Sequence, residues 1–302
     1  MIPVVLGERN TLFELNHINN FNGVSDVKND IPPRSAESPE VSARRLGRAA
    51  RAFDALGVDF VFLLYPTKAW LLPQDVPQSF LLPGGHARAE AGLAHFIAEL
   101  RKNDVPLVDG VAEAKDFANL NPGVPMWNRG SAHWTEALAC HVNQQVMRVA
   151  RAQAMKRRGE VGEPDPGMRC KLLPPAEPTG SDVDLATLIN VWDSSRFNDP
   201  VRPVSVGRAA RGGPSRVLII GTSYSNPLKR FIARSGLGRS RSAAYYRSFH
   251  RNGLRLPDDF AGQKLVIFEQ WQWSYLTVNI QEFLDDMERE TPEFAEAMRR
   301  TD

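Results

Sequence analysis

A serine at the end of an apolar segment is the first residue whose surroundings favour chemistry. Residues 217–220 are apolar and predict a buried strand, and residues 228–234 predict a helix soon after it. Ser223 lies between them, where the free N–H groups at the start of a helix can stabilise an oxyanion. Ser223 is therefore a candidate nucleophile, which requires a base to remove its proton. The alternative is that Ser223 or Ser225 only caps the helix.

A histidine in a second segment could act as that base. His133 stands directly before a helical pattern at residues 135–156, with Thr135 as the candidate N-cap. An imidazole with an unperturbed pKa of about 6.5 can accept and return a proton at neutral pH. The alternative is a structural histidine packed beside Trp134.

Three aromatic residues follow a third apolar segment, residues 265–268. Trp271, Trp273 and Tyr275 are interleaved with polar residues there. Flat rings can stack on the C–H faces of sugars, so this segment is a candidate carbohydrate-binding surface. Packing in the core and at its rim is the alternative.

Regular elements must position these side chains. Strands are predicted at residues 58–65, 105–108, 217–220 and 265–268, and helices at residues 42–56, 88–103, 135–156 and 281–298. Residues 24–42 and 157–179 are predicted to be loops, because both segments are polar and contain several prolines. The alternation predicts an α/β domain in three α/β/α layers with a mostly parallel sheet. In such sheets ligands bind beyond the carboxyl ends of the strands.

The composition is that of a globular protein and argues against a wholly disordered, collagen-like or coiled-coil chain. Of the 302 residues 42% are hydrophobic, and 37 basic and 35 acidic residues give a net charge of +2. A strong overall attraction to nucleic acid or membrane is therefore not expected. No apolar run is long enough to cross a membrane, and the first residues do not form a signal peptide. We expect a soluble chain, or one whose targeting segment has been removed.

Charge is distributed unevenly along the chain. Residues 200–257 contain twelve lysines and arginines and no acidic residue, whereas residues 258–302 contain eleven acidic and four basic residues. The basic segment could attract an anionic polymer, or its charges could be solvated and paired with the acidic region.

The two cysteines, Cys140 and Cys170, are too few for a disulfide scaffold and lack the spacing of a zinc site. They either form one disulfide in an oxidising compartment or remain buried thiols, and the second is the simpler interpretation. The sequence contains no metal-ligand motif and no phosphate-binding glycine loop, so no cofactor is expected.

Taken together, the motifs resemble those of the SGNH-hydrolase-like alginate O-acetyltransferases, the group that includes AlgJ and AlgX. Residues 221–225 match the family's Gly-[Thr/Asp]-Ser-[Tyr/Phe]-Ser motif, and residues 131–134 match in part its Asp-x-His-Trp motif. Residues 4–13 and 61–68 are similar to its opening Gly-x-x-x-x-Leu-Phe segment and to its strand that ends in Pro-x-Lys. The histidine precedes the serine, as in this family.

The resemblance implies an SGNH-like fold and acetyl transfer to an exported, alginate-like polysaccharide in the periplasm. Ser223 would carry the acetyl group, and His133 would activate Ser223. The residues expected to bind the polysaccharide are Arg129, Tyr224, Trp271 and Trp273. Expected partners are a membrane-bound acyltransferase and other subunits of an export complex, and no nucleic acid. We expect a catalytic domain at residues 42–302, with residues 1–41 as an N-terminal extension and loop packed on it.

One position departs from the family's pattern. Ser131 stands where the family has the aspartate that orients the imidazole and stabilises the imidazolium. Three outcomes are open: Ser131 takes the place of the acid in a weakened catalytic site, a carboxylate comes from elsewhere, or the site only binds. The loop region that could supply a carboxylate contains Asp182, Asp184 and Asp193. A carbohydrate esterase and a non-catalytic polysaccharide-binding or scaffold subunit are therefore the alternatives to a transferase.

Overall fold

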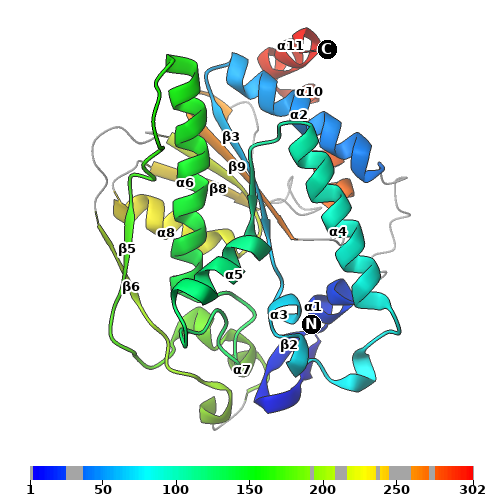
Figure 1. Cartoon of the computed structure of the whole chain (residues 1–302), viewed down its shortest axis with the longest axis vertical. Coiled ribbons are helices and arrows are strands. Elements are labelled where there is room, and N and C mark those ends of the chain that lie inside the picture. Colours follow the sequence, from blue (N-terminus) through cyan, green and yellow to red (C-terminus); the bar gives the residue numbers. More distant parts are fainter. Residues whose placement is uncertain are drawn as a thin grey trace.

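The computed structural model describes residues 3–24, 37–190, 194–207, 216–235, 239–244, 260–271 and 276–301. At its centre is a five-stranded sheet in the order β4-β3-β9-β7-β8, in which every neighbouring pair is parallel (Figure 1). The strands are β3 (Asp59–Tyr65), β4 (Leu107–Asp109), β7 (Arg216–Gly221), β8 (Arg239–Ala244) and β9 (Leu265–Trp271). The predicted α/β fold with a parallel sheet is confirmed, although the sequence did not predict β8.

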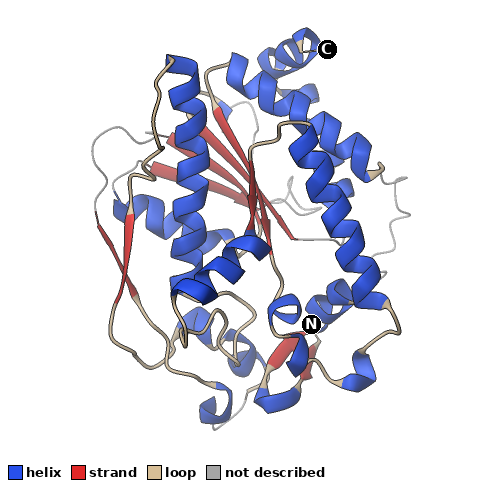
Figure 2. Ribbon diagram, viewed as in Figure 1, coloured by secondary structure: helices blue, strands red, loops and turns tan. Residues whose placement is uncertain are grey.

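Helices cover both faces of this sheet (Figure 2). One face packs against α2 (Pro39–Ala55), α4 (Gly85–Lys102), α10 (Leu276–Glu290) and α11 (Pro292–Arg300). The other face packs against α5 (Gly110–Leu120), α6 (Glu136–Arg158) and α8 (Ser225–Ser235). Side chains of β3 alternate between the two cores: Phe60 and Phe62 belong to the first, and Val61 and Leu63 to the second. Because both faces are buried, β3 is a continuous apolar segment in the sequence.

The helix ends follow local sequence signals. Thr135 caps α6, since its hydroxyl accepts the N–H of Leu138 at 3.4 Å, and Gly159 ends α6 at a φ of 66°. The predicted helix at residues 281–298 is instead two helices, because Pro292 lacks the N–H that would continue α10 and starts α11. Within the described ranges, no helix combines the length and the apolar character needed to cross a membrane.

A small N-terminal unit packs on this domain. β1 (Val4–Leu6) and β2 (Leu12–Glu14) form an antiparallel hairpin, and α1 (Leu15–Phe21) follows it. α1 contacts α4 and the short helix α3 (Lys68–Leu71), which comes directly after β3. The expected boundary at residue 41 falls inside α2. The division of the chain into an extension and a catalytic domain stays a prediction.

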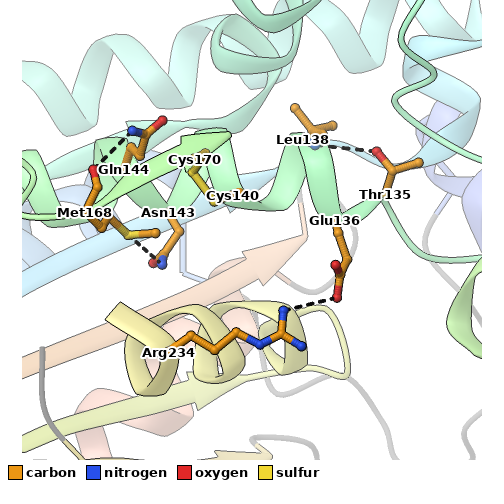
Figure 3. The surroundings of a disulfide bond; sticks show 9 residues. All are labelled: Thr135, Glu136, Leu138, Cys140, Asn143, Gln144, Met168, Cys170 and Arg234. Atoms are coloured by element: carbon orange, nitrogen blue, oxygen red, sulfur yellow. Dashed lines mark hydrogen bonds and ion pairs between the residues drawn. A yellow bond between two sulfur atoms is a disulfide. The ribbon is translucent and has the colours of Figure 1, made fainter. Parts of the chain in front are cut away.

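A long excursion leaves the domain after α6. β5 (Arg169–Leu172) pairs antiparallel with β6 (Val204–Gly207), and the segment between them contains α7 (Asp184–Leu188). Cys170 of β5 forms a disulfide with Cys140 of α6, because β5 runs beside α6 (Figure 3). The interpretation of two free thiols is therefore wrong, and part of the predicted loop at residues 157–179 is a strand. The disulfide holds the base of the excursion against α6.

The short 3-10 helices are Glu8–Asn10, Pro73–Asp75, Gln78–Phe80, Gly180–Asp182 and Ser194–Phe197.

Candidate active site

Ser223 stands beyond the carboxyl end of β7, in the turn that leads into α8. The carbonyl oxygen of Thr222 accepts hydrogen bonds from the N–H of Ser225 at 3.1 Å and from its hydroxyl at 2.7 Å. Ser225 is buried in these contacts, whereas Ser223 is exposed. Of the two serines, only Ser223 is therefore accessible to a substrate.

The imidazole of His133 reaches Ser223 from the loop between α5 and α6. Nε2 of His133 lies 2.7 Å from Oγ of Ser223. An antiparallel bridge between Trp127 and Trp134 closes the loop around the histidine. Because an imidazole nitrogen at this distance can accept the proton of a hydroxyl, the pair has the geometry of a nucleophile and a general base.

Asp184 extends this pair from the first residue of α7. Its Oδ2 lies 2.5 Å from Nδ1 of His133, and its Oδ1 accepts the backbone N–H of Ala132 at 2.8 Å. The Asp184 side chain is 30% exposed and that of His133 is 19% exposed. A carboxylate at Nδ1 favours the tautomer protonated there, which leaves Nε2 free to accept a proton from Ser223. Three separate segments thus form a continuous Ser–His–Asp chain.

Ser131 does not replace the acid, which corrects our expectation for this residue. Its hydroxyl lies 2.9 Å from the carbonyl oxygen of His133 and 2.5 Å from that of Ser181, and it accepts the N–H of His133 at 2.9 Å. All of these partners are backbone groups, and none of them is an atom of the imidazole ring. Ser131 therefore joins the His133 loop to the excursion that carries Asp184.

Of the other two aspartates of the loop region, only Asp182 is among the described residues, and it makes no hydrogen bond with His133. Asp182 accepts the N–H of Thr179 at 3.4 Å in a capping box, and burial raises its pKa. Asp193 lies outside the described residues. Over those same residues, no group of three or more His, Cys, Asp or Glu side chains is arranged to hold a metal ion.

A buried ammonium group holds the backbone just before His133, and it belongs to the lysine of the Pro-x-Lys segment, Lys68. Lys68 follows β3 and has no exposed surface. Its Nζ lies 2.7, 2.9, 2.8 and 2.9 Å from the carbonyl oxygens of Leu12, Asn128, Arg129 and Ser131, respectively. Burial lowers the pKa of Lys68 to about 7, and the charges of nearby aspartates, Asp184 first among them, act in the opposite direction. Lys68 thereby ties the N-terminal hairpin to the loop of the proposed base.

Arg129, which we expected to bind substrate, is instead paired within the protein. Its Nη2 lies 3.0 Å from Oδ1 of Asp199, and its Nε donates to Oδ2 at 3.0 Å. A further N–H of the guanidinium donates to the carbonyl oxygen of Arg9 at 3.1 Å. This bidentate pairing holds two loops together and corrects the substrate-binding assignment.

Tyr224, also expected to bind substrate, is only 3% exposed. Its ring stacks on Tyr65 with 4.3 Å between centroids, and its hydroxyl hydrogen-bonds with the carbonyl oxygen of Ala132 and with His17. The ring centroid of His133 lies 4.7 Å from that of Tyr224. Tyr224 therefore supports the imidazole from the protein interior, which corrects its assignment as a substrate contact.

The remaining predicted contacts are only partly described. Trp271 is the last residue of β9 and pairs in register with Tyr65, so its backbone lies at the same edge of the sheet as the Ser223 turn. Trp273 lies outside the described residues, and both tryptophans remain predicted substrate contacts. In the basic segment, Arg230 and Arg234 pair with Glu136 of α6 rather than with the acidic C-terminal region. Figure 3 shows the pair between Arg234 and Glu136.

One family model matches the sequence of this chain, and solved structures share its fold. Residues 26–235 match the model of the family described as SGNH hydrolase-like domain, acetyltransferase AlgX. The O-acetyltransferase domain of Pseudomonas putida AlgJ is similar, with a TM-score of 0.58 over 99% of this chain and 100% of that chain, at 19% identity. Pseudomonas aeruginosa AlgX gives a TM-score of 0.52 over 94% of this chain and 67% of that chain, at 15% identity. No curated protein sequence matches the chain. At these identities the two structures show a common fold.

Proposed function

The chain belongs to the family of SGNH hydrolase-like AlgX acetyltransferase domains, and on this basis we propose that it transfers acetyl groups to hydroxyls of an exported polysaccharide through an acetyl ester on Ser223. The observation that carries the proposal is the Ser223–His133–Asp184 chain, with 2.7 Å between Oγ and Nε2 and 2.5 Å between Nδ1 and Oδ2. These three residues provide a nucleophile, a base and a carboxylate that stabilises the protonated base.

The reaction follows in two steps. In the first, Oγ of Ser223 attacks the carbonyl carbon of the acetyl donor while Nε2 of His133 takes the serine proton. The leaving group then departs with that proton, and Ser223 holds the acetyl ester. In the second step, a sugar hydroxyl gives its proton to Nε2 and attacks the ester, and the same proton returns to Oγ as the acetylated sugar leaves. Asp184 stabilises the imidazolium in both steps.

The start of α8 supports the charge that develops in each step. α8 begins two residues beyond Ser223, at Ser225, and ends at Ser235. A helix N-terminus carries a partial positive charge, which lowers the energy of a nearby tetrahedral oxyanion. The position of Ser223 before α8 therefore favours an acyl-enzyme mechanism over a purely structural role for this serine.

A non-catalytic role has less support than it had from the sequence. That alternative depended on Ser131, which leaves the His133 motif without an acid. The carboxylate of Asp184 occupies the position on Nδ1 that such an acid requires. A carbohydrate esterase would use the same three residues, with water in place of the sugar hydroxyl. The two activities therefore differ only in the molecule that receives the acetyl group.

The disulfide supports a periplasmic location. Disulfides persist in oxidising compartments and are rare in the cytosol, and the Cys140–Cys170 bond closes a segment of the chain with a sequence separation of 30. We propose, from the family, that a membrane-bound acyltransferase supplies the acetyl group there within an export complex. The polysaccharide would bind beside Ser223, with Trp271 and Trp273 as candidate stacking surfaces.

The test uses a chromogenic acetate ester as donor, with and without a mannuronate oligosaccharide as acceptor. We expect the wild-type protein to release chromophore and to form acetylated oligosaccharide, detected by mass spectrometry, and Ser223→Ala to do neither above background. Ser205→Ala is the matched control, because Ser205 is exposed on β6. Equal rates for the wild type and Ser223→Ala would exclude the mechanism. Chromophore release without acetylated oligosaccharide would indicate an esterase.

A further inference from the structure

A buried carboxyl group lies beside the turn that carries Ser223, and the reaction described above does not use it. Glu269 belongs to β9 and has no exposed surface. β9 lies between β3 and β7, where Glu269 pairs in register with Leu63 and adjoins Gly221. Burying a carboxyl group in the centre of a sheet costs free energy, so its contacts must account for its presence.

Both carboxyl oxygens of Glu269 contact Thr222, the residue before the nucleophile. Oε2 accepts the backbone N–H of Thr222 at 2.7 Å, and Oε1 lies 3.1 Å from its hydroxyl oxygen. That hydroxyl oxygen accepts the N–H of Tyr224 at 3.2 Å and lies 3.0 Å from the hydroxyl of Tyr65. The backbone is therefore fixed on both sides of Ser223, at the N–H of Thr222 and at the N–H of Tyr224.

Gly221 provides the space that this carboxyl group occupies. A Cβ atom at residue 221 would lie 2.0 Å from Oε2 of Glu269, and 2.8 Å from its Cβ. Any other residue at this position would displace the carboxyl group from Thr222. The glycine in β7 and the glutamate in β9 thus together allow the contact between Glu269 and the Ser223 turn.

We propose that Glu269 is a positioning residue for Ser223, which it holds through Thr222, and that it does so in its protonated, uncharged form. This inference rests on the proposed function, because Ser223 is the nucleophile only there. In the protonated form, the O–H of Glu269 donates to the hydroxyl oxygen of Thr222, whose own proton goes to Tyr65. Oε2 continues to accept the N–H of Thr222, so the turn keeps its hydrogen bonds without a buried charge.

The surroundings of Glu269 favour that uncharged form. Burial raises its pKa to about 8, although the hydrogen bonds from Thr222 act in the opposite direction. In the described part of the chain, no charged side chain contributes to this shift. The cations of α8 nearest to α6, Arg230 and Arg234, pair with Glu136. The other titratable groups around the turn are His133, Lys229, Tyr65 and Tyr224.

The protonation state of Glu269 has a consequence for the rate. When Glu269 ionises, a negative charge forms in a buried position next to the turn where the oxyanion develops. Like charges repel strongly where water is excluded, so the ionised form disfavours the tetrahedral intermediate. We therefore expect the acyl-transfer rate to fall as the pH rises through about 8.

The experiment compares pH–rate profiles for release of chromophore from an acetate ester, with Ser223→Ala as the blank at each pH. With a pKa of about 8, we expect the wild-type rate at pH 9 to be roughly a tenth of the rate at pH 7. In Glu269→Gln the amide oxygen accepts from Thr222 and the amide N–H donates to its hydroxyl, as the protonated acid does. This variant should lose the alkaline decline, with a ratio of rates close to one. Glu296→Gln is the matched control and should keep the wild-type profile, because Glu296 is half-exposed on α11 and pairs there with Arg299 and Arg300. An unchanged alkaline decline in Glu269→Gln would overturn the proposal.

A second measurement separates this inference from the proposed function. The unfolded chain releases the Glu269 proton near pH 4.5, whereas the folded chain keeps it up to about pH 8. The unfolding equilibrium constant of the wild type, relative to Glu269→Gln, should therefore rise up to tenfold per pH unit between these values and level off above them. If the unfolding equilibrium shows this pH dependence but the protein has no esterase activity, the proposed function is refuted and the protonated state of Glu269 is not. Parallel stability curves for the two proteins would overturn the protonated state of Glu269. Thr222→Val should remain folded and lose most of its rate at pH 7, and a wild-type rate there would overturn positioning through Thr222.

Discussion

Replacing Asp184 by asparagine should be more damaging than replacing it by alanine, because of a hydrogen bond on the far side of the carboxylate. Oδ1 accepts the N–H of Ala132 at 2.8 Å, while Oδ2 lies 2.5 Å from Nδ1 of His133. An asparagine that keeps its oxygen on Ala132 turns its NH₂ group toward Nδ1. The imidazole must then carry its proton on Nε2, where it can no longer accept the proton of Ser223.

The magnitude follows from two contributions. The opposite amide rotamer restores the tautomer but places two donors against each other at Ala132, which costs about 2 kcal/mol. Two unit charges about 4 Å apart attract by about 4 kcal/mol at an effective dielectric of 20. We take half of this, about 2 kcal/mol, for the stabilisation of the imidazolium by Asp184, because its side chain is 30% exposed. Asp184→Ala removes the charge without forcing a tautomer on the imidazole, and it should reduce kcat/KM roughly 30-fold. Asp184→Asn loses both and should reduce it roughly 10³-fold.

The assay is the kcat/KM for hydrolysis of a chromogenic acetate ester, measured for both variants and for Asp182→Asn as a neighbouring control. Asp182 caps a 3-10 helix of the same excursion and should tolerate the amide. Wild-type activity in Asp184→Ala would refute the role of the carboxylate. A faster Asp184→Asn than Asp184→Ala would refute the argument from the tautomer.

Three further predictions concern stability. Replacing both Cys140 and Cys170 by alanine opens a loop of sequence separation 30 and should lower the free energy of unfolding by about 3.6 kcal/mol in the chain-entropy model. Unchanged urea midpoints would contradict this. Lys68→Met should lower the free energy of unfolding by about 3 kcal/mol or more, because buried carbonyl oxygens lose their donor. A loss below about 1 kcal/mol in the same assay would contradict the role of the ammonium group in holding these carbonyl groups. Burial lowers the pKa of His17 to about 3, so the unfolded chain binds a proton that the folded chain excludes. Relative to His17→Asn, stability should thus fall by about 1.4 kcal/mol per pH unit on acidification from about pH 6.5 to 3. His17→Asn should lose this dependence in acid titrations followed by circular dichroism.

The sheet and its main helices could be predicted because each follows from a local pattern. β3 and β7 are apolar runs buried on both faces, and α6 has both an N-cap threonine and a C-terminal glycine. β5 and α7 have no such pattern, since their places depend on pairing with β6 and on the disulfide to α6. The break between α10 and α11 follows from Pro292, a local signal inside the helix predicted at residues 281–298.

The candidate site was predictable to the extent that strand ends determine it. Ser223 and His133 were identified from their positions before predicted helices, and the sheet brings both to one edge. Asp184 was only one of three loop aspartates, because its distance from His133 depends on the path of the whole excursion. Tyr224 and Arg129 were misassigned because a motif does not show which of its side chains face the interior. Lys68 belongs to the Pro-x-Lys segment, but the motif does not show that four carbonyl oxygens surround its ammonium group.

The position of Asp184 bears on how inactive homologues are recognised. The carboxylate and the histidine that it contacts are 51 residues apart, so a scan for the short Asp-x-His-Trp motif would classify this chain as a pseudoenzyme. A carboxylate needs only to reach Nδ1, and natural selection can preserve that position in space while the residue that supplies it moves to another part of the chain. Loss of the motif aspartate is therefore weak evidence for loss of catalysis wherever an acidic excursion passes the same histidine.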